Sequence, residues 1–408
     1  MNAIVDRDFP VSSPGARQPG LAQTLTLLVT SSLTVMVTAV VGPSLPTMQA
    51  HFRDVPGADA LVPLTMSAPL LMMALLSVAV GELADRWGRK RLLVASAIAY
   101  GIVGTMPLYL DSLAAILASR VGLGAFEAVL TTVGATLIGD YFAGLQRERY
   151  MALQTTVGAV AAVVLAVIGG ALAQWGWRVP YAMFGASLAL APLLALLLWE
   201  PPSRATMTLA QQIEDSQSFS GHALTWRCVL GFLLGFEFLI LNVHFGYLQA
   251  AVGVDSTALI GLAYALNSVG AIAGTLLFGW HLASAVSVPT CLGLGALLGG
   301  GSLMVMPFTT TYATLTAAGV VTGIGMGILF PAMANWNMRE LPVSRRGVGT
   351  GAYNSCLAFG MFVSPLAVVG LETLIGGSRV RAVAVGGWAL LAAGLAALGV
   401  GLSRQPHR

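Results

Sequence analysis

Three ionisable side chains lie deep within long apolar runs of this sequence. Of the seventeen acidic residues, Glu127 and Glu237 fall clearly in the middle of such runs, and Arg120 is the deep cation. If the runs cross a bilayer, each such group costs at least about 2.5 kcal/mol to insert and usually has a function. We expect both acids to line a central cavity and one or both to exchange protons, with Arg120 organising that cavity or binding an anionic substrate group. The alternative is that each acid caps a polar pocket and never titrates.

The spacing of these groups adds a geometric expectation. Arg120 and Glu127 are seven residues apart, which is about two helical turns and places them on one face of a helix. The helical rise separates them by roughly 10 Å, too far for a direct ion pair without a third group or a water molecule. Glu237 lies between Phe236 and Phe238 in the other half of the chain. Deep charges in both halves favour a transport role over a purely structural one.

The elements that position these groups follow from composition. The 408 residues are 56% hydrophobic and only 9% charged, whereas soluble domains carry about a quarter charged residues. The apolar runs are continuous, which excludes the short alternating strands of a β-barrel. The sequence therefore predicts a multi-pass α-helical membrane protein. The net charge of +3 is slight, and we expect no nucleic-acid partner.

Counting apolar runs predicts twelve membrane-spanning helices. They are placed near 21–43, 61–84, 92–110, 113–139, 150–174, 179–199, 228–250, 257–280, 287–306, 312–337, 349–371 and 382–402. The predicted divisions are a cytoplasmic tail over 1–20, a six-helix bundle over 21–199, a cytoplasmic central loop over 200–227, a second six-helix bundle over 228–402, and a tail over 403–408.

The basic residues predict the orientation of these spans. With the N-terminus inside, fifteen Lys and Arg residues fall in inside segments and four in outside segments. Because cytoplasmic loops carry an excess of Lys and Arg, both termini are predicted to be cytoplasmic. The expected location is the plasma membrane, which is the inner membrane of a bacterium.

A faint repeat suggests that the two bundles are related. At an offset of 198 residues, Gly81 maps onto Gly279, and the loop at Arg147 maps onto the loop at Arg345. Two parallel halves with a midplane site between them are typical of many secondary transporters. The predicted fold is an all-α membrane protein with twelve transmembrane helices in two pseudo-symmetric six-helix bundles around a central cavity.

A basic segment between the second and third spans has a recognisable pattern. Gly81-x-Leu83-Ala84-Asp85-Arg86-x-Gly88-Arg89-Lys90-Arg91 resembles the loop 2–3 signature of the major facilitator superfamily. Arg120-Val121-Gly122-Leu123-Gly124 is similar to that superfamily's R-x-x-x-G pattern in span four. The resemblance covers the transmembrane region and implies a drug- or metabolite-exporter-like transporter.

The resemblance also implies a gate at the cytoplasmic side. Its residues are Gly81, Asp85, Arg86, Gly88, Arg89 and Asp140. Asp85 would face the start of span eleven near Gly349, and a relay through Arg89 to Asp140 would latch the gate closed in the outward-facing state. The two glycines would permit close helix approach and a tight turn. The alternative is that the cations only set topology and bind anionic lipid.

Other polar residues give weaker indications. Asn267 and Asn354 are possible substrate contacts, or they join helices by hydrogen bonds. His244 is expected to be an ordinary interfacial histidine. We expect no metal ligands: the three cysteines, Cys228, Cys291 and Cys356, have no paired spacing and are interpreted as small apolar residues. No cofactor is expected, and no catalytic constellation or Walker loop indicates an enzyme.

These observations favour a secondary transporter working by alternating access, with proton-coupled efflux of small, partly apolar compounds as the first hypothesis. One difference from the family's proton-driven exporters weakens the efflux hypothesis. Exporters usually carry a G-P-x-x-G-G turn in span five, and the stretch from Leu165 to Gly170 keeps its final glycines but lacks its Gly-Pro pair. A proton symporter for an organic acid or sugar is the close alternative. A non-transporting membrane receptor on the same fold is the second. The expected partners are a small-molecule substrate, protons and the lipid bilayer, and the protein is expected to be a monomer.

Overall fold

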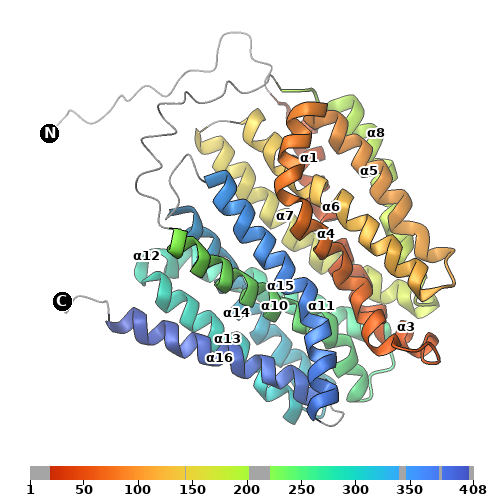
Figure 1. Ribbon diagram of the computed structural model, residues 1–408, viewed down its shortest axis with the longest axis vertical. Coiled ribbons are helices and arrows are strands. Elements are labelled where there is room, and N and C mark those ends of the chain that lie inside the picture. The colour runs from red at the N-terminus through yellow and green to blue at the C-terminus, as the bar shows by residue number, and fades with distance from the viewer. Residues whose placement is uncertain (1–18, 143, 202–220, 340–345, 376–378, 404–408) are drawn as a thin grey trace.

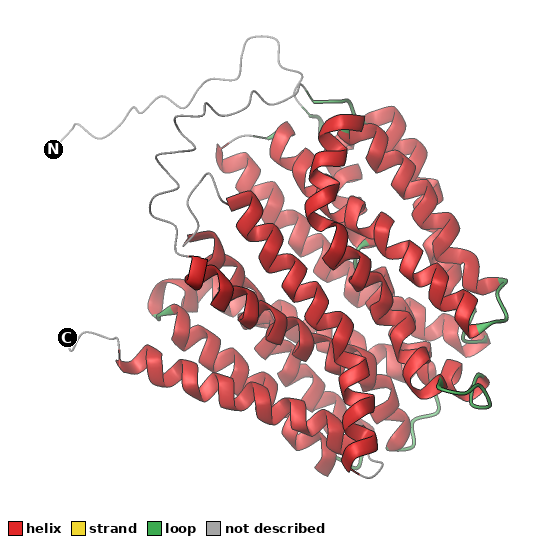
Figure 2. Ribbon diagram, viewed as in Figure 1, coloured by secondary structure: helices red, strands yellow, loops and turns green. Residues whose placement is uncertain are grey.

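The computed structural model describes residues 19–142, 144–201, 221–339, 346–375 and 379–403. Over those residues the regular structure is helical throughout, and Figure 2 shows helices joined by short loops. In the first half the α-helices are α1 Leu21–Leu33, α2 Met36–Val41, α3 Leu45–His51, α4 Ala58–Trp87, α5 Arg89–Thr105, α6 Leu113–Tyr141, α7 Gly144–Leu172 and α8 Ala186–Leu197. In the second half they are α10 Gly221–Ala251, α11 Thr257–Leu277, α12 Ala283–Ala285, α13 Val288–Val305, α14 Tyr312–Arg339, α15 Arg346–Ile375 and α16 Arg379–Ser403.

The described residues contain an apolar helix, or a bent helix pair, at each of the twelve predicted spans. Ten helices are long and apolar enough to cross a bilayer. The bent pair Leu21–Leu33 and Met36–His51 adds an eleventh if it is one span, and α16 contains a shorter apolar helix, Arg381–Leu395, at the place of the twelfth predicted span. The fold class is therefore an all-helical membrane protein, as the sequence predicts.

The first span differs from its prediction as one helix over 21–43. It bends by 48° after Leu33 and continues to His51. The cause is local: the Ser31 hydroxyl donates to the Leu28 carbonyl, and the Thr34 hydroxyl donates to the Ser31 carbonyl at 2.8 Å. Hydroxyl groups that bond back to the preceding turn compete with the helix ladder and bend it.

The helices form two bundles, which pack against each other mainly through two pairs of helices. Figure 1 shows α1 to α8 grouped on one side and α10 to α16 on the other. The largest packing surfaces between them join α4 to α15 and α7 to α11. Within the bundles the helices approach closely at glycines. A methyl group at Gly124 would overlap the Pro69 carbonyl of α4, and one at Gly360 would overlap the Phe232 carbonyl of α10.

The two ends of the bundle differ in chemistry. We call the end that carries Arg86, Arg89, Lys90 and Arg91 the basic end, and the other the distal end. At the distal end, three side-chain hydrogen bonds between described residues join the halves. The Thr257 hydroxyl donates to the Gly170 carbonyl at 2.9 Å, the Gln174 amide donates to the Ser256 hydroxyl at 3.4 Å, and the Tyr247 hydroxyl donates to Gln49 at 3.4 Å.

Candidate functional site

Arg120 lies wholly inside the first half. On α6 it is 0% exposed, and its Nη2 donates to the carbonyls of Val103 at 2.8 Å and Gly104 at 3.0 Å. Its guanidinium carbon lies 5.1 Å from the ring centroid of Tyr181 and 5.3 Å from that of Phe184, both in the 3-10 segment Val179–Gly185. Carbonyls and aromatic faces thus solvate the charge.

Arg120 keeps one free donor. Within the part of the chain that the structure describes, its Nη1 is buried without a hydrogen-bond partner. An unsatisfied buried donor is costly, so this group is available to an anion or to water.

Glu127 lies two turns further along α6, as the spacing predicts. It is 4% exposed, and its Oε2 has no hydrogen-bond partner among the described residues. Tyr100 of α5 is fully buried and interacts electrostatically with both Glu127 and Arg120. The Tyr100 hydroxyl donates to the Leu33 carbonyl at 2.7 Å, at the bend of the first span. Sequence reasoning missed this tyrosine because its relation to α6 depends on how α5 packs.

Glu237 lies inside the second half. It is 3% exposed on α10, and its Oε2 has no partner among the described residues. A methyl group at Gly386 of α16 would stand 3.4 Å from that oxygen, so the carboxyl group lies between α10 and α16. Both acids are therefore buried in protein, each in the interior of its own half, and neither faces lipid. Their proton-exchange role stays a prediction.

His244, two turns beyond Glu237, is not at an interface with solvent. The prediction of an ordinary interfacial histidine is therefore wrong. The His244 side chain is 0% exposed, and its ring centroid lies 6.1 Å from that of Tyr247. The outer part of α10 is covered by neighbouring helices, which the apolar pattern alone did not reveal.

The predicted gate residues form a connected network at the basic end. Arg89 donates to Asp85 at 2.8 Å and also to Asp140 of α6. The Asp85 side chain is 66% exposed, and Arg86 is exposed beside it. The structure thus brings together the three members of the predicted relay, all within the first half. Its gating role, including the contact near Gly349, stays a prediction.

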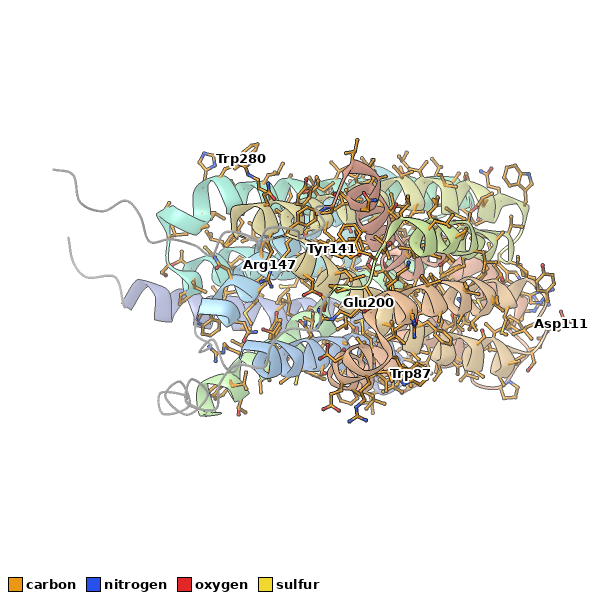
Figure 3. The ribbon with its side chains drawn as sticks, turned by 90° about the horizontal axis from the view of Figure 1, so that it is seen from above. Trp87, Asp111, Tyr141, Arg147, Glu200 and Trp280 are labelled. Atoms are coloured by element: carbon orange, nitrogen blue, oxygen red, sulfur yellow. The ribbon has the colours of Figure 1, made fainter. Side chains whose placement is uncertain are left out.

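Sequence reasoning missed a fourth member, Glu200. Its carboxylate accepts the backbone amides of Arg89 at 2.5 Å and Lys90 at 3.0 Å, which are the first residues of α5. A carboxylate at a helix N-terminus satisfies free amides and complements the helix dipole. Figure 3 shows Glu200 near Tyr141 and Trp87, far from Asp111 at the distal end. Its signal in the sequence is an isolated acid directly after the sixth apolar run.

The two gate glycines differ in what they do. Gly88 has φ +91°, a conformation that favours glycine, and a methyl group there would stand 3.0 Å from a Glu200 oxygen. Gly81, by contrast, has open space where a methyl group would be. The predicted tight turn therefore fits Gly88, whereas close helix approach does not explain Gly81 in this conformation.

The two amides proposed as substrate contacts lie in different settings. The Asn267 side chain donates to the Gly319 carbonyl at 2.7 Å and so ties α11 to α14. Asn354 of α15 is exposed. It lies two turns from Met361 on the same face, and Met361 is part of the apolar core of the first half. Asn354 is therefore on the α15 face that turns toward the other half.

A family model and two known proteins match this sequence. The model of the Major Facilitator Superfamily matches residues 27–365. The quinolone resistance protein NorA of Staphylococcus aureus (strain COL) is 21% identical over 332 residues, which cover 80% of this chain and 84% of NorA. The uncharacterized MFS-type transporter YdgK of Bacillus subtilis (strain 168) is 22% identical over 249 residues. That match covers 58% of this chain and 60% of YdgK, less than two thirds of that relative.

Solved structures share the fold. A bacterial homologue of the human lysosomal transporter Spinster, in an inward-facing and occupied conformation, superposes with a TM-score of 0.70 at 18% identity and covers 93% of this chain and 94% of its own. The nucleoside transporter NupG superposes with a TM-score of 0.72 at 11% identity, with 93% of this chain and 99% of NupG covered.

Proposed function

The chain belongs to the major facilitator superfamily of membrane transporters, and we propose that it exports small, partly apolar compounds in exchange for protons by alternating access. The observation that carries the proposal is one buried acid in each half, Glu127 and Glu237, each with a carboxyl oxygen that has no hydrogen-bond partner among the described residues. A buried carboxyl group that no cation binds directly is most stable when it holds a proton. We propose that each acid takes up a proton on one side of the membrane and releases it on the other.

We propose that the basic end lies on the cytoplasmic side of the plasma membrane. The cations at that end support it, because basic loops stay on the cytoplasmic side. The hydrogen bonds that join the halves at the distal end support an inward-facing conformation, as does the exposure of Asp85 and Asn354. The central loop over 200–227 falls largely outside the described residues. We propose that the transporter acts as a monomer.

Efflux is favoured over uptake by the resemblance to a quinolone resistance protein. The alternative, a proton symporter for an organic acid or sugar, has one observation in its favour: the free donor of Arg120, which suits an anionic group. A non-transporting receptor on the same fold is the second alternative, but such a protein has no use for a buried acid in each half. Nor do we propose an enzyme, because the family consists of transporters.

Proteoliposomes with an imposed pH gradient test the proposal. We would follow a fluorescent quinolone as the efflux probe, with D-xylose and lactate as probes for symport. The wild type is expected to accumulate quinolone against its gradient when protons flow the opposite way. The double variant Glu127→Gln and Glu237→Gln is expected to lose accumulation, whereas Glu82→Gln, which changes an exposed acid of α4, is expected to keep it.

The outcomes separate the hypotheses. Full accumulation by the double variant would show that these acids do not couple protons to transport. Proton-driven uptake of xylose or lactate, without quinolone movement, would support the symporter instead. No movement of any probe by a folded wild type, together with retained binding of one of them, would favour the receptor.

A further inference from the structure

The hydroxyl group of Tyr264 takes part in the backbone hydrogen bonding of another helix. On α11, Tyr264 is 4% exposed, and its hydroxyl accepts the Gly246 N–H at 3.2 Å while it donates to the Asn242 carbonyl at 2.6 Å. Both backbone groups belong to α10 and are four residues apart, so a regular helix joins them directly to each other. The phenol oxygen therefore bonds both groups of one turn of the α10 ladder.

This turn divides α10 into two parts with different contacts. The part before Asn242 carries Glu237, whose carboxyl group lies between α10 and α16. The part from Gly246 onward carries Tyr247, whose hydroxyl donates to Gln49 of the first half at 3.4 Å. The bonded hydroxyl thus lies between the buried acid of the second half and a distal contact with the first half.

The first half packs against the same turn. Gly42 begins the 3-10 segment Gly42–Ser44 of the first span, and a methyl group there would stand 3.0 Å from the Tyr264 ring. A methyl group at Gly246 would stand 3.2 Å from the Gly42 carbonyl oxygen. Backbone from both halves therefore meets at the Tyr264 hydroxyl, and the first half confines the ring in this conformation.

A helix turn with such a hydroxyl bends more easily than a regular turn. Sharp bends occur where a side chain enters the hydrogen-bond ladder of a helix. When this turn opens, the hydroxyl still offers an acceptor to the Gly246 amide and a donor to the Asn242 carbonyl. Opening therefore avoids the cost of leaving buried backbone groups unpaired.

We propose that Tyr264 makes this turn the hinge of α10 in the transport cycle. When the distal end opens, Gly42 moves away with the first half, and the part of α10 beyond Gly246 bends. The part that carries Glu237 keeps its packing. Tyr264 acts through the α10 backbone and is a positioning residue. The inference rests on the proposed alternating access, but the hinge can be measured without a substrate.

Hydrogen–deuterium exchange of the full-length protein in nanodiscs tests the hinge. Tyr264→Phe removes the hydroxyl, so the Gly246 amide and the Asn242 carbonyl would bond directly to each other. The regular turn should open less often, and amide exchange reports such local opening. We expect exchange in the peptide over 243–251 to slow at least about threefold relative to the wild type.

A second tyrosine supplies a matched control. The Tyr312 hydroxyl donates to the Leu259 carbonyl of α11 at 2.9 Å, so Tyr312→Phe also removes a bond to a backbone carbonyl of the second half. It should leave exchange over 243–251 unchanged. In proteoliposomes, Tyr264→Phe should lower the initial rate of quinolone transport at least about fivefold, because hinge motions often limit such cycles. Quinolone binding should stay unchanged, and Tyr312→Phe should match the wild type in both measurements.

A role of Tyr264 in packing alone predicts the opposite exchange result. Loss of its hydrogen bonds would then loosen α10, so faster or unchanged exchange over 243–251 in Tyr264→Phe would overturn the hinge. A wild type that moves no quinolone would contradict the proposed function, and the exchange comparison would still decide the hinge.

Gly42→Ala gives an independent test if Tyr264→Phe does not fold. The added methyl group would push against the Tyr264 ring and favour the open distal end. We expect exchange over 243–251 to become at least about threefold faster, with exchange over 288–305 in α13 unchanged. Unchanged exchange over 243–251, or equally faster exchange in both peptides, would overturn the hinge.

Discussion

The carboxylate of Glu200 accepts the backbone N–H of Arg89 at 2.5 Å, although 111 residues separate them. Together with its second bond to Lys90 at 3.0 Å, this contact fastens the end of the sixth span to the start of the third. The same Arg89 holds Asp85 and Asp140 through its side chain. Glu200 therefore holds the backbone of Arg89, and the Arg89 side chain joins the two acids of the charged network.

Replacing Glu200 by alanine should loosen this network. The first amides of α5 would lose their acceptor, and loss of such a cap costs about 0.5–2 kcal/mol. We expect a lower melting temperature in detergent, measured by intrinsic fluorescence. Glu82→Ala, which removes an exposed acid of the neighbouring helix, is the control. Equal melting temperatures for the two variants would mean that the cap adds nothing to stability.

Gly88 and Gly81 should respond in opposite ways to alanine. Gly88→Ala forces a side chain into a left-handed conformation and against Glu200, at a cost of about 1–3 kcal/mol. Gly81→Ala enters open space within α4 and should stabilise the helix by up to about 1 kcal/mol. Thermal unfolding and expression level would measure both. A strongly destabilised Gly81→Ala would reveal a close approach at Gly81 in another conformation of the cycle.

The glycines that follow Arg120 offer a second matched pair. Gly124→Ala would push against the Pro69 carbonyl, whereas Gly122→Ala would meet its nearest atom, a methyl group of Val103, at 3.9 Å. Overpacking costs about 1–3 kcal/mol, and a backbone neighbour cannot rotate away. We therefore expect Gly124→Ala to unfold at lower temperature than the wild type and Gly122→Ala to be at least as stable as the wild type. Two indistinguishable variants would contradict the α4–α6 packing.

Asn354 should be reachable from the basic end. In a background free of native cysteines, Asn354→Cys is expected to react with a membrane-impermeant maleimide in inside-out vesicles and to stay unlabelled in intact cells. Met361→Cys on the same face, where the native side chain is 8% exposed and belongs to the apolar core of the first half, should react in neither. Labelling of Asn354→Cys in intact cells alone would reverse the proposed orientation.

The sequence predicts the fold well because a bilayer leaves few solutions: continuous apolar runs must be helices. Arg120 and Glu127 could be placed on one face because they share a helix. The positions of Tyr100 and Glu200 depend on packing between separate helices, which spacing along the chain does not encode. The three cysteines look alike in sequence, yet Cys291 is buried and contacts a backbone carbonyl, whereas Cys228 and Cys356 are half-buried.

The distal contacts between the halves have a consequence for the kinetics of the cycle. The three bonds between described residues there join neutral groups: a hydroxyl to a carbonyl, an amide to a hydroxyl, and a hydroxyl to an amide. Breaking them separates no opposite charges, so the rate of this step should hardly change with ionic strength. The basic end holds charged groups close to solvent, where dissolved salt screens their interactions. Varying the salt concentration should therefore change the rate at which the basic end opens or closes. The rate at which the distal contacts break should stay unchanged.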